Sequence, residues 1–295
     1  DEGRSWKNVT PKELGEAVIN CIEVSPHDPA TAYIVAHRYR FNDLRPMIFF
    51  TSDYGKSWIR INEGIAGNHF VRVVREDPLR PGLLYAGTEA GIYISFDQGR
   101  QWHPFQLNLP ICPITDLTIR DNDLIASTSG RGFWILDDLG PLQQSMGVLP
   151  RRQAVLFQPK PTVRFTAKKS YEQEQALGAN PPNGVIINYY LPWRMDQQEL
   201  TLQIFDNNQH LVRTFSNQPD GKLTEYDNGS DPEYILPDQQ GVNRFYWDLR
   251  RTPIPGVPDI FVYGSYQSGL VAPGNYILRL ISPVDTLEQP FEIVA

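Results

Sequence analysis

The sequence predicts an all-β protein in which about three four-stranded blades of a partial β-propeller precede an immunoglobulin-like (Ig-like) β-sandwich. The 295 residues include 25 prolines, 22 glycines and many aromatic side chains, a composition typical of short strands joined by turns. A motif of aspartate, glycine and tryptophan also recurs at intervals of about 40 to 50 residues, the period of propeller blades. We therefore expect blades over residues 1–145, a Pro-rich linker over 146–160 and the sandwich over 161–295.

The recurring motif has the pattern Asp-x-Gly-x-x-Trp, and a fourth copy lacks the tryptophan. The copies comprise Asp1, Gly3 and Trp6, then Asp53, Gly55 and Trp58, then Asp97, Gly99 and Trp102, and finally Asp138 and Gly140. The aspartate can accept backbone N–H bonds in a hairpin turn, the glycine supplies a positive φ, and the tryptophan packs between blades. We therefore interpret these residues as structural rather than catalytic.

The stretches between the motifs repeat as well. Apolar segments at 19–24, 70–75 and 114–119 are each followed by a turn and a second segment, at 32–36, 83–87 and 124–127 respectively. Each unit thus has four short strands, with the motif between the third and the fourth. Because propellers contain about four to eight blades, about three cannot close a ring, and we expect further blades upstream on the same or a separate chain.

The motif resembles the Asp box of bacterial-neuraminidase-repeat (BNR) and sortilin-type propellers. Residues 39–58 look like the bacterial sortilin-N-terminal-like proteins, and residues 130–138 look like the last blade of that family. The resemblance covers residues 1–145. It implies a longer secreted, periplasmic or cell-surface parent with a signal sequence and further blades upstream.

The second half predicts about seven strands, which suits a sandwich. Six of the segments that read as strands are 184–191, 200–205, 211–215, 241–249, 272–280 and 291–294. A Pro-Gly-x-Tyr sequence at 273–276 is similar to fibronectin-like and flagellar-hook-capping-type Ig-like domains. That resemblance implies an architecture rather than an activity.

Composition also excludes several classes of function. A net charge of −7 without a basic block gives no reason to expect nucleic acid or an anionic bilayer as a partner, and no apolar run reaches the ~20 residues that membrane insertion needs. The two cysteines, Cys21 and Cys112, fall in non-adjacent blades, so we expect no disulfide between them. No histidines share metal-ligand spacing and no glycine loop fits a phosphate, so we expect neither metal nor cofactor.

The candidate binding residues come from loops on one face of the propeller. If the blades have this register, the Asp boxes lie on one face, and the loops between second and third strands and between blades lie on the other, here called the top face. The candidates there are His37, Arg38, Tyr39, Arg40, Asn42, Asp43, Arg45, His69, Glu89 and Arg131. Such a mixed surface could hold a carboxylate, a sugar or a peptide terminus, whereas the alternative is a solvated loop whose arginines pair locally with Asp43 and Glu89.

These observations favour a binding or scaffold module, outside the cell or in the periplasm, whose top face binds a protein, peptide or glycan. A second hypothesis is a fragment of a glycoside hydrolase with most catalytic residues on upstream blades, which paired acids facing the central channel would favour. A third is a structural component of a cell-surface assembly. We assign no catalytic residue, because no complete catalytic set can be assembled from this sequence.

Overall fold

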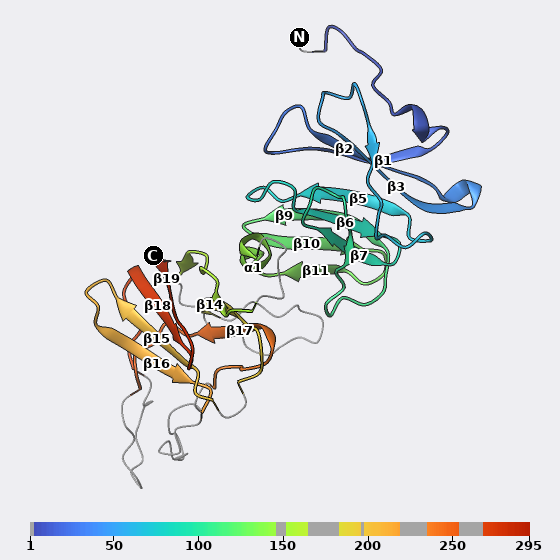
Figure 1. Ribbon diagram of the computed structural model, residues 1–295. Helices are drawn as coiled ribbons and strands as arrows, with labels where there is room; N and C mark the ends of the chain where they lie inside the picture. Colours follow the sequence, from blue (N-terminus) through green and yellow to red (C-terminus); the bar gives the residue numbers. More distant parts are fainter. Residues whose placement is uncertain (1–2, 146–151, 165–182, 196–197, 219–234, 254–267) are drawn as a thin grey trace. The chain divides into compact units, whose positions relative to one another are not determined.

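The computed structural model describes residues 3–145, 152–164, 183–195, 198–218, 235–253 and 268–295. The protein is nearly all β, and the chain divides into two compact units, residues 1–139 and residues 140–295 (Figure 1). We call them the blade unit and the C-terminal unit. No helix in the described part of the chain is long and apolar enough to cross a membrane.

The blade unit consists of three antiparallel sheets in which strands that follow one another in the sequence are hydrogen-bonded neighbours. The first sheet contains β1 (Val18–Val24), β2 (Ala32–Arg38), β3 (Asp43–Thr51) and β4 (Ile59–Arg60). The second contains β5 (Val71–Glu76), β6 (Leu84–Thr88), β7 (Gly91–Ser95) and β8 (His103–Pro104). The third contains β9 (Ile114–Arg120), β10 (Asp123–Thr128) and β11 (Phe133–Leu136). This strand order is that of propeller blades, which confirms the predicted fold class.

The sheets of the blade unit pack against one another through apolar side chains that alternate along their strands. β5 lies against β1 and β2 of the first sheet and against β9 of the third. One buried cluster joins Tyr33 and Ile48 of the first sheet to Val74 and Leu84 of the second. Because burying a Val, Leu or Ile side chain contributes about 1.5–3 kcal/mol, this shared core gives each sheet a reason to lie against its neighbour.

Two short 3₁₀ helices flank strands of the first sheet. η1 (Lys12–Leu14) precedes β1, and its buried Leu14 packs with Ile34 and Phe49. η2 (Tyr39–Phe41) connects β2 to β3 and ends at Asn42, whose φ of 57° reverses the chain. η2 therefore fixes the backbone of the loop that carries most of the candidate binding residues.

The C-terminal unit contains two sheets around one core. The smaller sheet contains β12 (Val155–Leu156), β14 (Val185–Leu191) and β17 (Gly241–Trp247). The larger contains β13 (Thr162–Val163), β19 (Thr286–Val294), β18 (Gly274–Ile281), β15 (Thr201–Asp206) and β16 (Leu211–Ser216), in that order. Buried residues of both sheets, among them Ile187, Trp247 and Leu278, form a single cluster. The two-sheet arrangement agrees with a sandwich, and its assignment as Ig-like stays a prediction.

The boundary between the units differs from the expected one. Residues 140–144, which we placed with the blades, form the helix α1 (Gly140–Gln144) of the C-terminal unit. β12 lies inside the expected linker and pairs with β14. The proline-rich composition of this region concealed a two-residue strand, because so short a strand has no readable period.

Candidate functional site

The turns between third and fourth strands show how the Asp box works. Between β3 and β4, the Asp53 carboxylate accepts hydrogen bonds from the Thr51 hydroxyl (2.8 Å) and from the Ser57 backbone N–H (2.9 Å). The Gly55 N–H donates to the Thr51 hydroxyl oxygen (3.0 Å), and the φ of Gly55 is 77°. Hydrogen bonds from Ser57 lower the pKa of Asp53 to about 2, so the carboxylate stays ionised as an acceptor.

The turn between β7 and β8 repeats this geometry. Asp97 accepts from the Ser95 hydroxyl (2.8 Å) and from the Gln101 N–H (2.9 Å), and Gly99 N–H donates to the Ser95 hydroxyl oxygen (2.9 Å). The Thr51 and Ser95 hydroxyls thus complete boxes whose aspartate and glycine were read from the sequence. Because every carboxylate contact lies inside its own turn, the geometry supports a structural role for these aspartates.

The box tryptophans link each turn to the segment that follows the previous box. Trp102 Nε1–H donates to the Ile61 carbonyl (2.8 Å), and Trp58 Nε1–H donates to the Val9 carbonyl (2.7 Å). Ile61 stands three residues after Trp58, as Val9 stands three residues after Trp6. The boxes are therefore connected in series. In the first copy, Asp1 lies outside the described residues, Gly3 has a φ of 80°, and Trp6 is 91% exposed.

The fourth copy of the motif does not form an Asp box. Asp138 has a φ of 63°, its N–H donates to the Asp123 carboxylate (2.8 Å), and Gly140 begins α1 instead of turning the chain. One feature of a box remains, because Leu139 N–H donates to the Asn122 carbonyl (2.8 Å) as Tyr54 N–H donates to the Ala30 carbonyl (3.0 Å) in the first sheet. The fourth copy also lacks the tryptophan, and the described part of the third sheet has no fourth strand for the turn to lead into.

The top-face candidates lie at the strand ends opposite the Asp boxes, and the structure brings some of them together. His37, at the end of β2, lies 4.9 Å from the Tyr39 ring and 5.4 Å from the Phe70 ring, measured between centroids. Tyr39 stacks on Phe70 at 5.3 Å with only 16° between the ring planes. We call His37, Tyr39 and Phe70 the ring cluster, and it joins the first sheet to the segment before β5.

The ring cluster is bordered by an ion pair from the second sheet. The guanidinium of Arg72 lies 5.1 Å from the Phe70 centroid and forms a 2.7 Å salt bridge with Glu89. Burial lowers the pKa of His37, and the positive charge of Arg72 adds to the effect, so the imidazole is held neutral. Its Nδ1 atom is buried and has no hydrogen-bond partner among the described residues. Sequence reasoning missed Phe70 and Arg72 because both lie in a segment that read as an ordinary buried strand.

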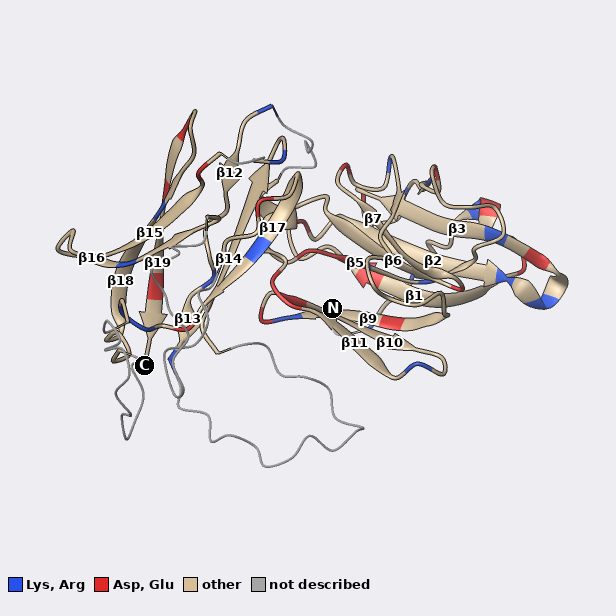
Figure 2. Cartoon of the chain, turned by 90° about the horizontal axis from the view of Figure 1, so that it is seen from below, with Lys and Arg blue, Asp and Glu red and all other residues tan. Residues whose placement is uncertain are grey.

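Asp43 pairs locally with two of the other candidates, as the solvated-loop alternative supposes. Arg45 donates to its carboxylate through Nε (2.8 Å) and Nη2 (2.7 Å), and Arg38 lies 3.8 Å away. These contacts, above all the hydrogen bonds from Arg45, hold the pKa of Asp43 well below its usual range. Figure 2 shows basic and acidic residues mixed around this loop at the β2–β3 end of the first sheet. Asn42 only ends η2.

Arg40 differs from these neighbours, because no carboxylate pairs with it in the described residues. Its guanidinium carbon lies 5.9 Å from the Tyr39 ring centroid, and Nε–H donates to the Tyr39 hydroxyl oxygen (3.3 Å). Both side chains are exposed. A cation fixed beside an accessible aromatic ring is thus present at the solvent side of the ring cluster.

The last two candidates lie outside the ring cluster. His69 Nδ1 is 3.0 Å from the Tyr93 hydroxyl on the second sheet. Arg131 lies in the turn between β10 and β11, where its backbone N–H donates to the Thr128 hydroxyl (3.1 Å) and its side chain is exposed. Because the described contacts of His69 and Arg131 are made with other residues than His37 and Tyr39, the top-face candidates do not form a single site.

Acidic residues on the first strands of the sheets test the hydrolase hypothesis. Glu23 on β1 and Asp116 on β9 both bind Arg75 on β5, at 3.1 and 2.8 Å. Burial raises the pKa of Glu23, and the charge of Arg75 opposes that rise. Since one guanidinium holds both carboxylates, the arrangement serves as a clamp across three sheets rather than as a free acid and base.

Metal and thiol chemistry find no further support in the described residues. They contain no group of three or more His, Cys, Asp and Glu side chains that could hold a metal ion. Cys21 and Cys112 are free, and Cys21 Sγ accepts a hydrogen bond from Arg75 (3.0 Å). Cys21 therefore belongs to the clamp.

No family model matches the chain, and no curated protein matches it. Among solved structures, the chain is similar to "YCF48 bound to D1 peptide", with 19% identity over 42% of this chain and 37% of that one and a TM-score of 0.32. It is also similar to a GH74 enzyme of Niastella koreensis, with 16% identity over 49% and 24% of the chains and a TM-score of 0.34. A third is the extracellular domain of BT4673 from B. thetaiotaomicron, with 10% identity over 90% and 29% and a TM-score of 0.28. This chain thus spans less than two fifths of the length of each.

Proposed function

We propose that this chain belongs to a secreted, periplasmic or cell-surface protein and that the top face of its first two sheets binds a protein or peptide. The observation that carries the proposal is the ring cluster with Arg40 beside it. Tyr39, Phe41 and Leu44 are 40%, 54% and 39% exposed at the same loop. Exposed aromatic and arginine side chains are the residues most often found at the energetic centre of protein interfaces.

The packing beneath these side chains supports a preorganised surface. Tyr39 stacks on Phe70, and Phe70 in turn lies under the guanidinium of Arg72. Asn42 ends η2 in a left-handed conformation, which fixes the loop backbone. A ligand would therefore lose little free energy in ordering this surface. Since Arg40 has no acidic partner in the described residues, we expect the bound segment to supply a carboxylate.

We further propose that upstream blades, on the same or a separate chain, cover the free face of the first sheet. Ile19, Ile22 and Val24 of β1 lie opposite Ala36, Ile34 and Ala32 of β2, on one side of the sheet, and are 40%, 63% and 62% exposed. A run of apolar side chains on one side of an innermost blade strand needs a neighbouring sheet. In the second sheet, the equivalent strand β5 is covered by β1 and β2 of the first sheet. By analogy, a sheet from an upstream blade would cover β1.

Peptide selection tests the binding proposal. Peptides selected by phage display on the full chain should carry an acidic side chain or a free C-terminal carboxylate. Their affinity for Arg40→Gln should fall by roughly tenfold, because this change removes the cation and leaves the fold intact. Arg131→Gln on the third sheet is the matched control and should bind as the wild type does. Selected peptides that bind Arg40→Gln and wild type equally would place the binding surface elsewhere.

A further inference from the structure

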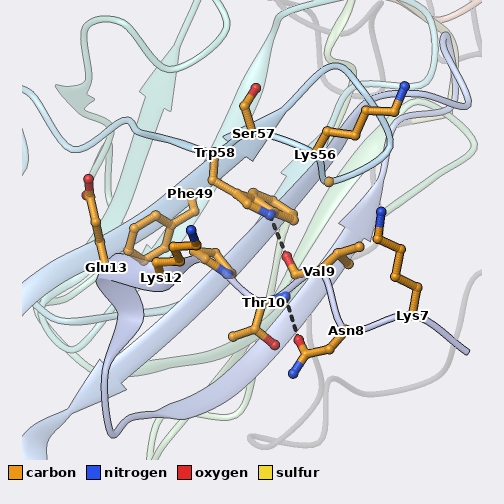
Figure 3. A pocket seen from close by; sticks show the side chains of 12 residues that line it. Lys7, Asn8, Val9, Thr10, Lys12, Glu13, Phe49, Lys56, Ser57 and Trp58 are labelled. Atoms are coloured by element: carbon orange, nitrogen blue, oxygen red, sulfur yellow. Dashed lines mark hydrogen bonds between the residues drawn. The ribbon is translucent and has the colours of Figure 1, made fainter.

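A pocket of about 440 Å³ lies at the other end of the first sheet, between the N-terminal segment and the first complete Asp box (Figure 3). Its polar and aromatic lining includes Lys7, Asn8, Thr10, Lys12, Lys56 and Trp58. The volume falls in the range of about 300–1,000 Å³ that is typical of sites for small ligands. None of these residues takes part in the ring cluster of the top face.

The second Asp box shows why the first one has a pocket. There the segment that follows Trp58 lies directly on Trp102. The backbone carbonyl of Glu63 accepts a hydrogen bond from the backbone N–H of Trp102 (2.8 Å), and a Cβ at Gly64 would lie 2.1 Å from the Trp102 carbonyl oxygen. Trp102 is consequently only 1% exposed. At the first box the N-terminal segment keeps the contact of Val9 with Gly55 but leaves Trp58 half-buried. The pocket is therefore a property of this box and not of the motif.

Positive charge gathers around the pocket although the whole chain carries −7. Lys7, Lys12 and Lys56 are exposed, and none of the three forms an ion pair within the described part of the chain. Figure 3 shows Lys7 and Lys56 at one end of the pocket and Glu13 at the opposite end. Three unpaired ammonium groups at the rim favour a ligand with more than one negative charge.

The remaining lining favours a sugar over a peptide. The Nε1–H of Trp58 donates a hydrogen bond to the Val9 carbonyl (2.7 Å), which fixes the orientation of the indole ring. The ring is half-buried and so remains partly accessible. Asn8 is ordered by the bond from Thr10 N–H to its side-chain oxygen (2.9 Å), which leaves its amide group as a donor. A pyranose ring has an apolar face of C–H groups surrounded by hydroxyls, and an aromatic plane bordered by polar donors complements both features.

We propose that this pocket binds an acidic saccharide built of carboxylate-bearing pyranose units. One ring stacks on Trp58, and the carboxylates of that unit and its neighbours pair with Lys7, Lys12 and Lys56. Lysine suits this task because its flexible stem lets a point charge follow carboxylates that are spaced along a polymer. The site is separate from the top face, because the loop that contains η2 and the Asp-box turn lie at opposite ends of β3.

Affinity electrophoresis and titration calorimetry of the full 295-residue chain test the proposal. The probes are polygalacturonate, the neutral polymer dextran and poly-L-glutamate. We expect binding to polygalacturonate, quenching of tryptophan fluorescence that Trp58→Phe removes, and little binding to the other two polymers. Lys56→Gln should weaken the binding roughly threefold, and Lys7→Gln together with Lys56→Gln roughly tenfold, as expected for exposed charge pairs.

Arg100→Gln is the matched control, because Arg100 holds in the second box the position of Lys56 in the first. It should leave the affinity unchanged. An equal loss in Arg100→Gln and Lys56→Gln would mean a non-specific charge effect and overturn the proposal. Binding of poly-L-glutamate as tight as that of polygalacturonate would overturn the saccharide assignment, and no binding of either would overturn the site. None of these outcomes bears on the peptide selection at Arg40.

Discussion

Arg75 shows how single side chains hold neighbouring sheets in register. From β5 it reaches Glu23 of the first sheet (3.1 Å), and its Nε–H also donates to the Leu117 carbonyl of the third (2.8 Å). Arg75 and Glu23 are mostly buried, with side chains 25% and 20% exposed, whereas Asp116 is 61% exposed. The pair with Glu23 is thus the part of the clamp whose loss leaves a charge away from water.

The stability of an Arg75→Gln variant should depend on pH. In the folded protein the pKa of Glu23 lies above the ordinary 4.5, so the folded state binds this proton more tightly, and stability falls as pH rises through that window. Removing Arg75 takes away the charge that opposes this shift. We expect Arg75→Gln to lower the free energy of unfolding by about 1–3 kcal/mol at pH 7 and by less at pH 4, where Glu23 is protonated.

Urea unfolding at the two pH values measures this difference. Arg120→Gln is the control, since Arg120 and Asp121 form an ion pair in which both side chains are about four-fifths exposed or more. Its effect should stay within about 0.5 kcal/mol at either pH. If Arg75→Gln lost the same stability at pH 4 as at pH 7, Glu23 would not be the group that Arg75 stabilises.

At the scale of elements, the close packing of sheets depends on small residues in the central strands. All five residues of β6 are buried, and Gly87 faces the third sheet. A Cβ placed there would lie 2.6 Å from Ile114 Cγ2 on β9 and 2.7 Å from Val73 Cγ1 on β5. The second and third sheets therefore approach too closely for any side chain at this position.

Gly87→Ala should separate or strain these sheets. We expect a loss of about 1–3 kcal/mol in the free energy of unfolding, because both contacting atoms belong to stiff β-branched side chains of the core. Gly67→Ala is the matched control, since a Cβ at Gly67 meets nothing within 4 Å. That substitution should change stability by less than about 0.5 kcal/mol. Equal effects of the two, measured by denaturant unfolding, would show that the sheets adjust without strain.

At the scale of the whole molecule, the free face of β1 governs how the chain behaves in solution. Its exposed stripe of Ile19, Ile22 and Val24 has no covering sheet in the described part of the chain. In the absence of upstream blades, burial of such a stripe against a second copy is the simplest way to remove it from water.

The isolated chain should therefore associate as its concentration rises. Light scattering after size-exclusion chromatography should give an apparent mass above the 33.7 kDa of one chain, and Ile22→Glu combined with Val24→Thr should return it toward that value. Leu79→Thr is the control, because Leu79 is 69% exposed but lies in the turn between β5 and β6 and not on β1. A wild-type chain that stays monomeric at every concentration would contradict this expectation.

Local sequence patterns determined the blades, because each blade is built from neighbouring strands. The Asp-box aspartate and glycine bond within their turn, and the tryptophan bonds to the segment that follows the previous box, so their spacing predicted where β3 meets β4 and where β7 meets β8. The same reasoning also predicted an Asp box at the fourth copy of the motif. Asp138 keeps the aspartate of the motif, but without the tryptophan the chain enters α1.

Contacts between residues about thirty to fifty positions apart were decided only by the tertiary structure. The bond of Arg75 to Glu23 and the stacking of Tyr39 on Phe70 arise where two sheets meet, and no periodicity within one sheet reveals which side chains will face each other there. The same holds for the pocket at Trp58, since Trp58 and Trp102 have the same local motif and differ in what covers them. The sequence determined the strand order of each blade because that order follows from hydrogen bonds between neighbours, whereas the candidate sites depend on how one blade packs on the next.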